Sequence, residues 1–324
     1  MHREITFIEA IRETYRAAMI KDQTVFILGE DVRIGIVPTT RGLYDEFGDK
    51  RVINTPICEN AIVGTAIGAA ISGMRPVAQI MFGDFLLLAV DEIANQAGQR
   101  HYITGGQLKV PLVIEVPTGA RGGSGYNHSQ SIETSFMYPP GLKVVCPSTP
   151  HDAKGLLWTA LFDDNPVLFF EHRRLFGLKS NVPVEPYGIP LGVADVKRKG
   201  EHATVVTFGW MLHQALKAAQ ELETEGISVE IIDLRTLVPL DIETIYTSLK
   251  RTGRLVVVEE GRKRGGIGSE IAATVMEENM SLLKAPIMRI GAPSVPIPYC
   301  PSLQEIYLPN ESDIAKTVKS LIKE

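Results

Sequence analysis

The sequence predicts an α/β protein with two doubly wound domains, each a mostly parallel sheet covered by helices on both faces. Short runs rich in β-branched residues alternate with segments of helical periodicity along the chain, and this alternation is typical of parallel sheets. The chain has 324 residues, more than one hydrophobic core usually serves. A segment rich in Pro and turn residues, 179–190, interrupts the alternation. We therefore expect a larger α/β domain at 1–185 and a smaller one at 186–324.

The individual strands and helices are predicted from the length and pattern of the apolar segments: short apolar runs indicate strands, and longer amphipathic segments indicate helices. In the first domain we expect strands at 24–28, 75–81, 111–116, 143–146 and 166–171, and helices at 6–20, 60–72, 85–102 and 151–162. The alternation restarts in the second domain. There we expect strands at 203–207, 228–233, 254–259 and 286–290, and helices at 211–225, 241–249, 269–278 and 312–322.

Composition and charge indicate no nucleic-acid or membrane partner. The net charge of -5 gives no general attraction to phosphate backbones. The longest apolar runs fall short of the roughly 18 residues of a membrane span, and the N-terminus has no apolar signal region. Cys58, Cys146 and Cys300 form no CxxC pair, so they predict neither a disulfide framework nor a zinc site. We expect a soluble, cytoplasmic protein.

Glu59 opens a stretch that carries no further charge as far as Met74, and Gly64, Gly68 and Ser72 recur within it at every fourth residue. In a helix, these small residues would form a flat stripe for a close neighbour. Burial without a cationic partner favours the protonated form of a carboxyl group, which suits proton transfer near neutrality. The alternative for Glu59 is a helix-start carboxylate satisfied by backbone amides and the helix dipole.

Two glycine-rich loops are further candidates. The loop 119–130 places His128 among small and polar residues, where backbone can approach a ligand and a histidine can titrate. The alternative is a mobile surface loop with an incidental histidine. The second loop, 264–270, lacks the GxGxxG spacing of a dinucleotide site. It favours a helix-start turn with Ser269 as the cap, although a non-catalytic Rossmann-like binding protein remains an alternative.

Several of these segments resemble one enzyme family. The segment 54–68 resembles the signature of thiamine-diphosphate enzymes, in which Glu is followed after four residues by Gly and after three more by Gly. The chain also resembles the β subunit of the decarboxylating component of 2-oxo acid dehydrogenase complexes, in phrases at 127–130, 140–145, 152–157, 164–167 and 232–237. Many independent phrases in the right order make this match specific.

The resemblance implies oxidative decarboxylation of a 2-oxo acid, with pyruvate as the first candidate and acyl transfer to lipoamide. Acetoin and branched-chain 2-oxo acids are the alternative substrates. In the family, the glutamate that matches Glu59 binds N1′ of the thiamine pyrimidine. The resemblance also places Ile57 and Phe85 beside the cofactor and His128 at the mouth of the channel.

The same resemblance implies metals and partners. A structural potassium ion would be bound through backbone carbonyls matching Leu112, Ala160, Leu161, Asp163 and Asn165. The chain lacks the Gly-Asp-Gly segment that holds Mg²⁺ and the diphosphate in this superfamily. We therefore expect an α subunit to supply Mg²⁺ and the diphosphate site in an α2β2 heterotetramer, and a lipoyl acyltransferase core to receive the acyl group.

Overall fold

Two sheets organise the computed structural model, which describes residues 2–323. The first sheet has seven strands in the order β12-β6-β7-β5-β4-β2-β3. Its strands are β2 (Val25–Gly29), β3 (Val52–Asn54), β4 (Arg75–Gln79), β5 (Val113–Thr118), β6 (Lys143–Val145), β7 (Val167–His172) and β12 (Thr236–Val238). All neighbours in this sheet are parallel except β12 and β6.

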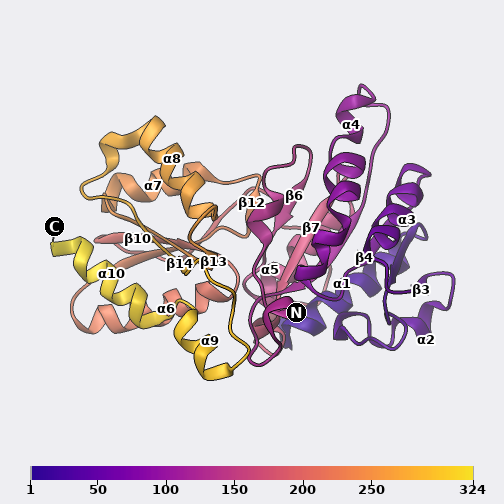
Figure 1. Cartoon of the computed structure of the whole chain (residues 1–324), viewed down its shortest axis with the longest axis horizontal. Helices are drawn as coiled ribbons and strands as arrows, with labels where there is room; N and C mark the ends of the chain where they lie inside the picture. The colour runs from indigo at the N-terminus through magenta and orange to yellow at the C-terminus, as the bar shows by residue number, and fades with distance from the viewer. Residues whose placement is uncertain (1, 324) are drawn as a thin grey trace.

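The second sheet has five strands in the order β14-β13-β10-β11-β9. They are β9 (Asp195–Arg198), β10 (Ala203–Thr207), β11 (Val229–Asp233), β13 (Leu255–Arg262) and β14 (Met288–Ala292). Only β9 runs antiparallel to its neighbour. The sheets form two lobes that lie side by side, with the C-terminus at the far end of the second lobe (Figure 1).

Helices cover both faces of each sheet. The first sheet packs α1 (Phe7–Lys21) and α5 (Pro150–Leu161) on one face and α3 (Glu59–Ile71) on the other. The second sheet lies between α6 (Trp210–Thr224) with α10 (Glu311–Lys323), and α7 (Ile242–Thr252) with α8 (Ile267–Asn279). Three short helices complete the set: α2 (Leu43–Phe47), α4 (Arg100–Ile103) and α9 (Pro301–Tyr307). No helix within 2–323 is long and apolar enough to cross a membrane.

The helix predicted at 85–102 is present, but it is not a single regular α-helix. A 3-10 helix spans Gly83–Ala89, a π-helix spans Glu92–Gly98, and only α4 continues beyond them. A tertiary contact constrains the end of the π-helix, because a Cβ atom on Gly98 would lie 2.8 Å from the carbonyl oxygen of Pro140. Such irregular helical turns are frequent near functional sites.

The segment rich in Pro and turn residues contains a strand that the sequence did not predict. β8 (Lys179–Pro183) pairs antiparallel with β1 (His2–Thr6), so the N-terminus is held against the end of the first lobe. Thr6 then caps α1 in a capping box with Glu9, which satisfies backbone donors at the helix start. The boundary at 185 stays a prediction, and β12 joins the first sheet from beyond it.

Buried polar groups link the two lobes. Asp152 on α5 lies 2.6 Å from Lys197 Nζ and 2.8 Å from Arg235 Nη2, both from the second half of the chain. Nearer the carboxyl edge of the first sheet, His172 Nε2 lies 2.8 Å from Glu260 Oε2. Because buried charges are costly unless paired, these contacts fix the relative position of the lobes.

Candidate functional site

The predicted catalytic residues lie beyond the carboxyl ends of neighbouring parallel strands. Glu59 follows β3 and begins α3, Phe85 follows β4, and His128 follows β5. Parallel strands direct all these ends to one edge of the sheet, which is where α/β folds bind ligands. The apolar face of α3 packs into the same core cluster as Leu86 from the turn that carries Phe85.

Glu59 is buried, with 7% of its surface exposed, and its carboxylate has no hydrogen bond or ion pair to another residue within 2–323. The alternative in which backbone amides satisfy Glu59 is therefore absent from the described part of the chain. Its charged surroundings are acidic: burial, and then the charges of Asp31 and Glu59, raise the pKa of Glu30. With no hydrogen bond or ion pair to a residue within 2–323, the oxygens of Glu59 are free to bind a ligand group.

Phe85 and His128 are in direct contact. Their ring centroids lie 5.2 Å apart at 82°, and the Phe82 ring centroid lies 4.5 Å from that of His128. Asn127 Oδ1 lies 2.9 Å from His128 Nδ1. Because an amide oxygen only accepts, His128 carries its proton on Nδ1 there, and Nε2 is left to a partner outside the loop.

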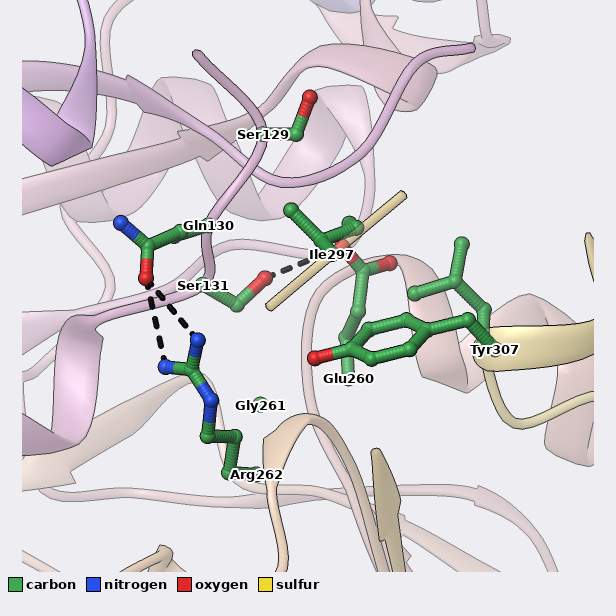
Figure 2. Close-up of a pocket in the computed structure, with 9 residues that line it drawn as sticks. Ser129, Gln130, Ser131, Glu260, Gly261, Arg262, Ile297 and Tyr307 are labelled. Atoms are coloured by element: carbon green, nitrogen blue, oxygen red, sulfur yellow. Dashed lines mark hydrogen bonds between the residues drawn. The ribbon is translucent and has the colours of Figure 1, made fainter. Parts of the chain in front are cut away.

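The loop of His128 is anchored to both lobes. Gln130 Nε2 donates to Asp84 Oδ1 at 2.8 Å, and the Arg262 guanidinium donates to Gln130 Oε1 at 3.2 and 3.3 Å. Ser131 Oγ donates to Glu260 Oε1 at 3.0 Å, and Figure 2 shows these last two contacts among the residues that line a small cavity. Burial raises the pKa of Asp84 despite the bond from Gln130.

Ile57 belongs to an exposed apolar surface next to Glu59. Its side chain is 71% exposed, and Leu87 and Leu88 are exposed on the neighbouring 3-10 turn. Gly64 and Gly68 are exposed on α3, and a Cβ atom on Gly68 would have no atom from another described element within 4 Å. The small residues are therefore not required by packing inside the chain, and exposed apolar surface of this kind marks an interaction site.

The five positions predicted to bind potassium cluster at the opposite end of β5 and α5, away from Glu59. The carbonyl oxygens of Leu161 and Asp163 already accept hydrogen bonds from Arg75 Nη1, at 3.3 and 2.9 Å. The carbonyls of Leu112 and Ala160 accept backbone amides. Because a carbonyl oxygen has two lone pairs, the set could still bind a cation, but it would share two ligands with Arg75.

The glycine turn at 264–270 is filled by the chain itself. Glu259 accepts the backbone N–H groups of Ile267 and Gly268 at the start of α8, and a Cβ atom on Gly266 would lie 2.1 Å from its Oε1. Glu259 thus occupies the place that a phosphate would take, and burial raises its pKa to about 7. Ser269 is not the cap as predicted; its hydroxyl accepts from Arg289 instead.

Sequence reasoning did not find Asp84, Arg173 or Glu260. Arg173 is buried, donates to the carbonyl oxygens of Gly119 and His128, and lies over the Phe82 ring at 5.1 Å. Its only signal was the polar and charged run 171–174 directly after the apolar stretch 167–170. A basic or acidic residue at such a strand end is worth treating as a site residue.

Comparison with known proteins agrees with this arrangement. The transketolase pyrimidine-binding domain matches residues 3–179, and the transketolase C-terminal domain matches residues 192–314. The chain is 43% identical to the 2-oxoisovalerate dehydrogenase subunit beta of Bacillus subtilis, with 98% of each chain covered. It is 44% identical to the pyruvate dehydrogenase E1 component subunit beta of Rickettsia bellii, again with 98% of each covered.

The chain belongs to the family of 2-oxo acid dehydrogenase E1 β subunits.

Other relatives extend the range of this E1 β family. The acetoin:2,6-dichlorophenolindophenol oxidoreductase subunit beta of Cupriavidus necator is 43% identical, over 100% of this chain and 99% of the relative. A solved structure described as a split gene transketolase, inactive beta4 tetramer, superposes with a TM-score of 0.82 at 25% identity, covering 98% of this chain and 99% of the other. The predicted family, with its two doubly wound domains, is confirmed. The family is thiamine-diphosphate dependent.

Proposed function

We propose that this E1 β subunit acts with an α subunit in the oxidative decarboxylation of a 2-oxo acid, with pyruvate as the first candidate. The acyl group would pass to lipoamide on a lipoyl acyltransferase core. The observation that carries the proposal is Glu59: a buried carboxylate at the ligand-binding edge of the sheet, with no partner within 2–323. A carboxylate used only for structure would be expected to have a hydrogen-bond partner.

Thiamine diphosphate would fit against these residues. Glu59 would bind N1′ of the pyrimidine and share a proton with it, while Phe85 and Ile57 would offer apolar surface to the ring. When bound, the cofactor supplies an acidic thiazolium C–H group whose deprotonated carbon attacks the substrate carbonyl. The chain's own contribution would be to hold the buried Glu59 carboxyl group against N1′, because a hydrogen bond shielded from water is stronger.

His128 would act on the substrate side. Its Nε2 is available because Nδ1 is engaged with Asn127, and the rings of Phe82 and Phe85 pack against it. The neutral ring would accept a proton at Nε2, and the doubly protonated ring could then donate that proton to the substrate carboxylate or to the incoming lipoyl group. Anchoring of its loop to Glu260 and Arg262 means that the second lobe helps to position it.

An α subunit would complete the site in an α2β2 heterotetramer. The exposed stripe of Gly64, Gly68 and Ser72 begins next to Glu59, and exposed Ile57 and Leu88 flank it. Because no atom of residues 2–323 fills the space above Gly68, a helix of another chain could approach closely. The α subunit would bring Mg²⁺ and the diphosphate site, for which this sequence has no Gly-Asp-Gly segment.

We also propose that K⁺ binds at the carbonyls near Arg75. Asp163 and Asp164 lie there with Lys143 and Lys109 as their ion-pair partners, so the neighbourhood is not strongly cationic. Backbone carbonyls can replace the hydration shell of such an ion. The ion would tie the end of α5 to the start of β7, and it takes no part in the chemistry.

Glu59→Gln and Glu59→Ala in the reconstituted α–β enzyme test the function. We expect the tetramer to assemble and decarboxylation, measured with 2,6-dichlorophenolindophenol, to fall by about 10²-fold or more. Glu305→Gln, an exposed glutamate of the second lobe, is the matched control and should keep full activity. Normal turnover by Glu59→Gln would remove the proposal.

The substrate is decided by a panel, because relatives named for pyruvate, 2-oxoisovalerate and acetoin are equally similar to this chain. The wild-type enzyme is assayed with pyruvate, 3-methyl-2-oxobutanoate and acetoin. We expect the highest kcat/KM with pyruvate. A higher value with either of the others would replace pyruvate as the substrate and leave the role of Glu59 unchanged.

A further inference from the structure

A second cavity lies at the same edge of the first sheet and is not assigned to any step above. It has a volume of about 580 Å³, within the range of small-molecule sites. Its walls come from the start of α1, from residues 36–41 after β2, and from the chain after β4, β5 and β7. Glu59, Phe85 and His128 do not line it, although Phe82 and Arg173 connect it to the His128 loop.

The charge of this cavity is strongly positive. Arg12, Arg41, Arg121 and Arg173 line it, against a single acidic residue, Glu9. Glu9 is already used in the cap of α1, where its Oε2 accepts the backbone N–H and hydroxyl of Thr6 at 2.7 Å. Within residues 2–323, none of the four guanidinium groups forms an ion pair with a carboxylate.

Three of the arginines keep most of their donors available. Arg12 and Arg121 make no side-chain hydrogen bond to another described residue, and Arg41 makes only a long one, 3.5 Å to Gly35 O. Arg173 is the one held in place, because it donates hydrogen bonds to the backbone carbonyls of Gly119 and His128. Burial, and then the charge of Arg121, hold the pKa of Arg173 below its usual range.

The four positively charged guanidinium groups repel one another, and a bound anion would reduce that repulsion. Planar guanidinium groups bind carboxylate and phosphate in bidentate fashion, and four of them exceed what one negative charge can balance. The remaining lining includes the apolar side chains of Ile36, Phe82 and Phe176. The ligand must therefore combine at least two negative charges with an apolar body.

We infer that this cavity, lined by Arg12, Arg41, Arg121 and Arg173, binds a small organic dianion with an apolar group. A phosphomonoester and a dicarboxylate share this chemistry. The bound anion would lie next to Arg173, which holds the His128 backbone carbonyl, so ligand binding is placed to stabilise the His128 loop.

Calorimetric titration of the full chain at pH 8 tests this site with three probes: phenyl phosphate, phenylsuccinate and benzoate. A phosphomonoester is a dianion at this pH, because its second pKa is about 6. We expect one saturable site whose affinity for the better dianion is at least about tenfold higher than for the monoanion benzoate. The affinity should fall when NaCl is raised from about 0.05 to 0.5 M.

Variants locate the site. Arg12→Gln, Arg41→Gln and Arg121→Gln should each weaken dianion binding about tenfold, while Arg264→Gln, an exposed arginine of the second lobe, should not. The tighter of the two dianions identifies the phosphoryl or dicarboxylate class. Absence of saturable binding, equal affinity for benzoate, or equal weakening by Arg264→Gln would overturn the inference. Because neither thiamine diphosphate nor an α subunit is present, the result is independent of the proposed function.

Discussion

His172 donates its Nε2–H to Glu260 across the junction of the two lobes, at 2.8 Å. The direction follows from the other ring nitrogen, since Nδ1 accepts the backbone N–H of Arg174 and so carries no proton. Glu260 also accepts from Ala120 N and Ser131 Oγ. One buried carboxylate therefore holds the β7 end, the His128 loop and β13 together.

Acid should loosen this junction. Burial alone would raise the pKa of Glu260, but the hydrogen bonds from His172 and Ala120, together with the charge of Arg174, outweigh it and hold the pKa below its usual range. The stabilisation is present above the unfolded-state pKa of about 4.5 and is lost as pH falls through the lower folded-state value. We expect the free energy of unfolding to drop below about pH 4.5, and Glu260→Gln to reduce that drop. Urea unfolding from pH 3 to 7 measures this free energy, with Glu305→Gln as control. If the free energy of unfolding of Glu260→Gln fell in acid as much as that of the wild type, Glu260 would not be the group responsible.

Glu133 should act in the opposite pH range. Burial, with added repulsion from Glu260, raises its pKa to about 8, so the folded state keeps a proton that the unfolded state releases near pH 4.5. Stability must therefore fall between about pH 4.5 and 8 and level off above. The change in the free energy of unfolding caused by Glu133→Gln should therefore be more favourable at pH 8.5 than at pH 5, by up to a few kcal/mol. A pH-independent effect in thermal unfolding would show that Glu133 is ionised in the folded protein.

His128→Gln should separate two half-reactions. Decarboxylation measured with an artificial electron acceptor should fall less than transfer to a lipoyl domain, for which we expect a loss of about 10²-fold. The KM for thiamine diphosphate should change little, because His128 is placed on the substrate side. His202→Gln, an exposed histidine of the second lobe, is the control. Full activity of His128→Gln with the lipoyl domain would eliminate this role.

Gly68→Leu tests the subunit surface. The chain alone should be as stable as the wild type or slightly more so, because the space above Gly68 is open and replacing glycine in a helix gains about 0.5–1 kcal/mol. Association with the α subunit should weaken by at least about tenfold, because a close helix contact cannot accept the larger side chain. Analytical ultracentrifugation of the mixed subunits measures this. Normal assembly would place the α contact elsewhere.

Potassium should stabilise the chain only modestly. With free ion at about 100 times its dissociation constant, linkage gives about 2.7 kcal/mol, which corresponds to a rise of a few degrees in Tm for a protein of this size. The measurement compares KCl with tetramethylammonium chloride at equal ionic strength. Equal Tm values would mean that the Arg75 guanidinium alone satisfies the Leu161 and Asp163 carbonyls.

The sequence predicted most elements that have strong periodicity of their own. The helices expected at 6–20, 60–72 and 151–162 correspond to α1, α3 and α5 within a residue or two. The segment expected as one helix at 85–102 divides into 3-10, π and α turns, and at the end of the π turn Gly98 meets Pro140, a contact between segments about forty residues apart. Periodicity cannot reveal such a contact.

The site was predictable to the same extent. Glu59, Phe85 and His128 were found because each lies in a distinctive local phrase, and the structure places them at one sheet edge, although their roles stay a prediction. The arginine-lined cavity was not found, since Arg12 and Arg173 are far apart in sequence and neither lies in a motif. Ser269 was misjudged for a related reason: the start of α8 is satisfied by Glu259 from the preceding strand.

The antiparallel pairing of β12 with β6 has a consequence for biosynthesis. Thr236 and Val238 close the outer edge of a sheet whose other strands are all complete by His172. A nascent chain must therefore emerge from the ribosome for more than sixty further residues before that edge is covered, and until then β6 is open to pairing with another chain. Cutting at residue 185 would make that exposure permanent, so the N-terminal fragment should aggregate unless the remaining segment is supplied in trans.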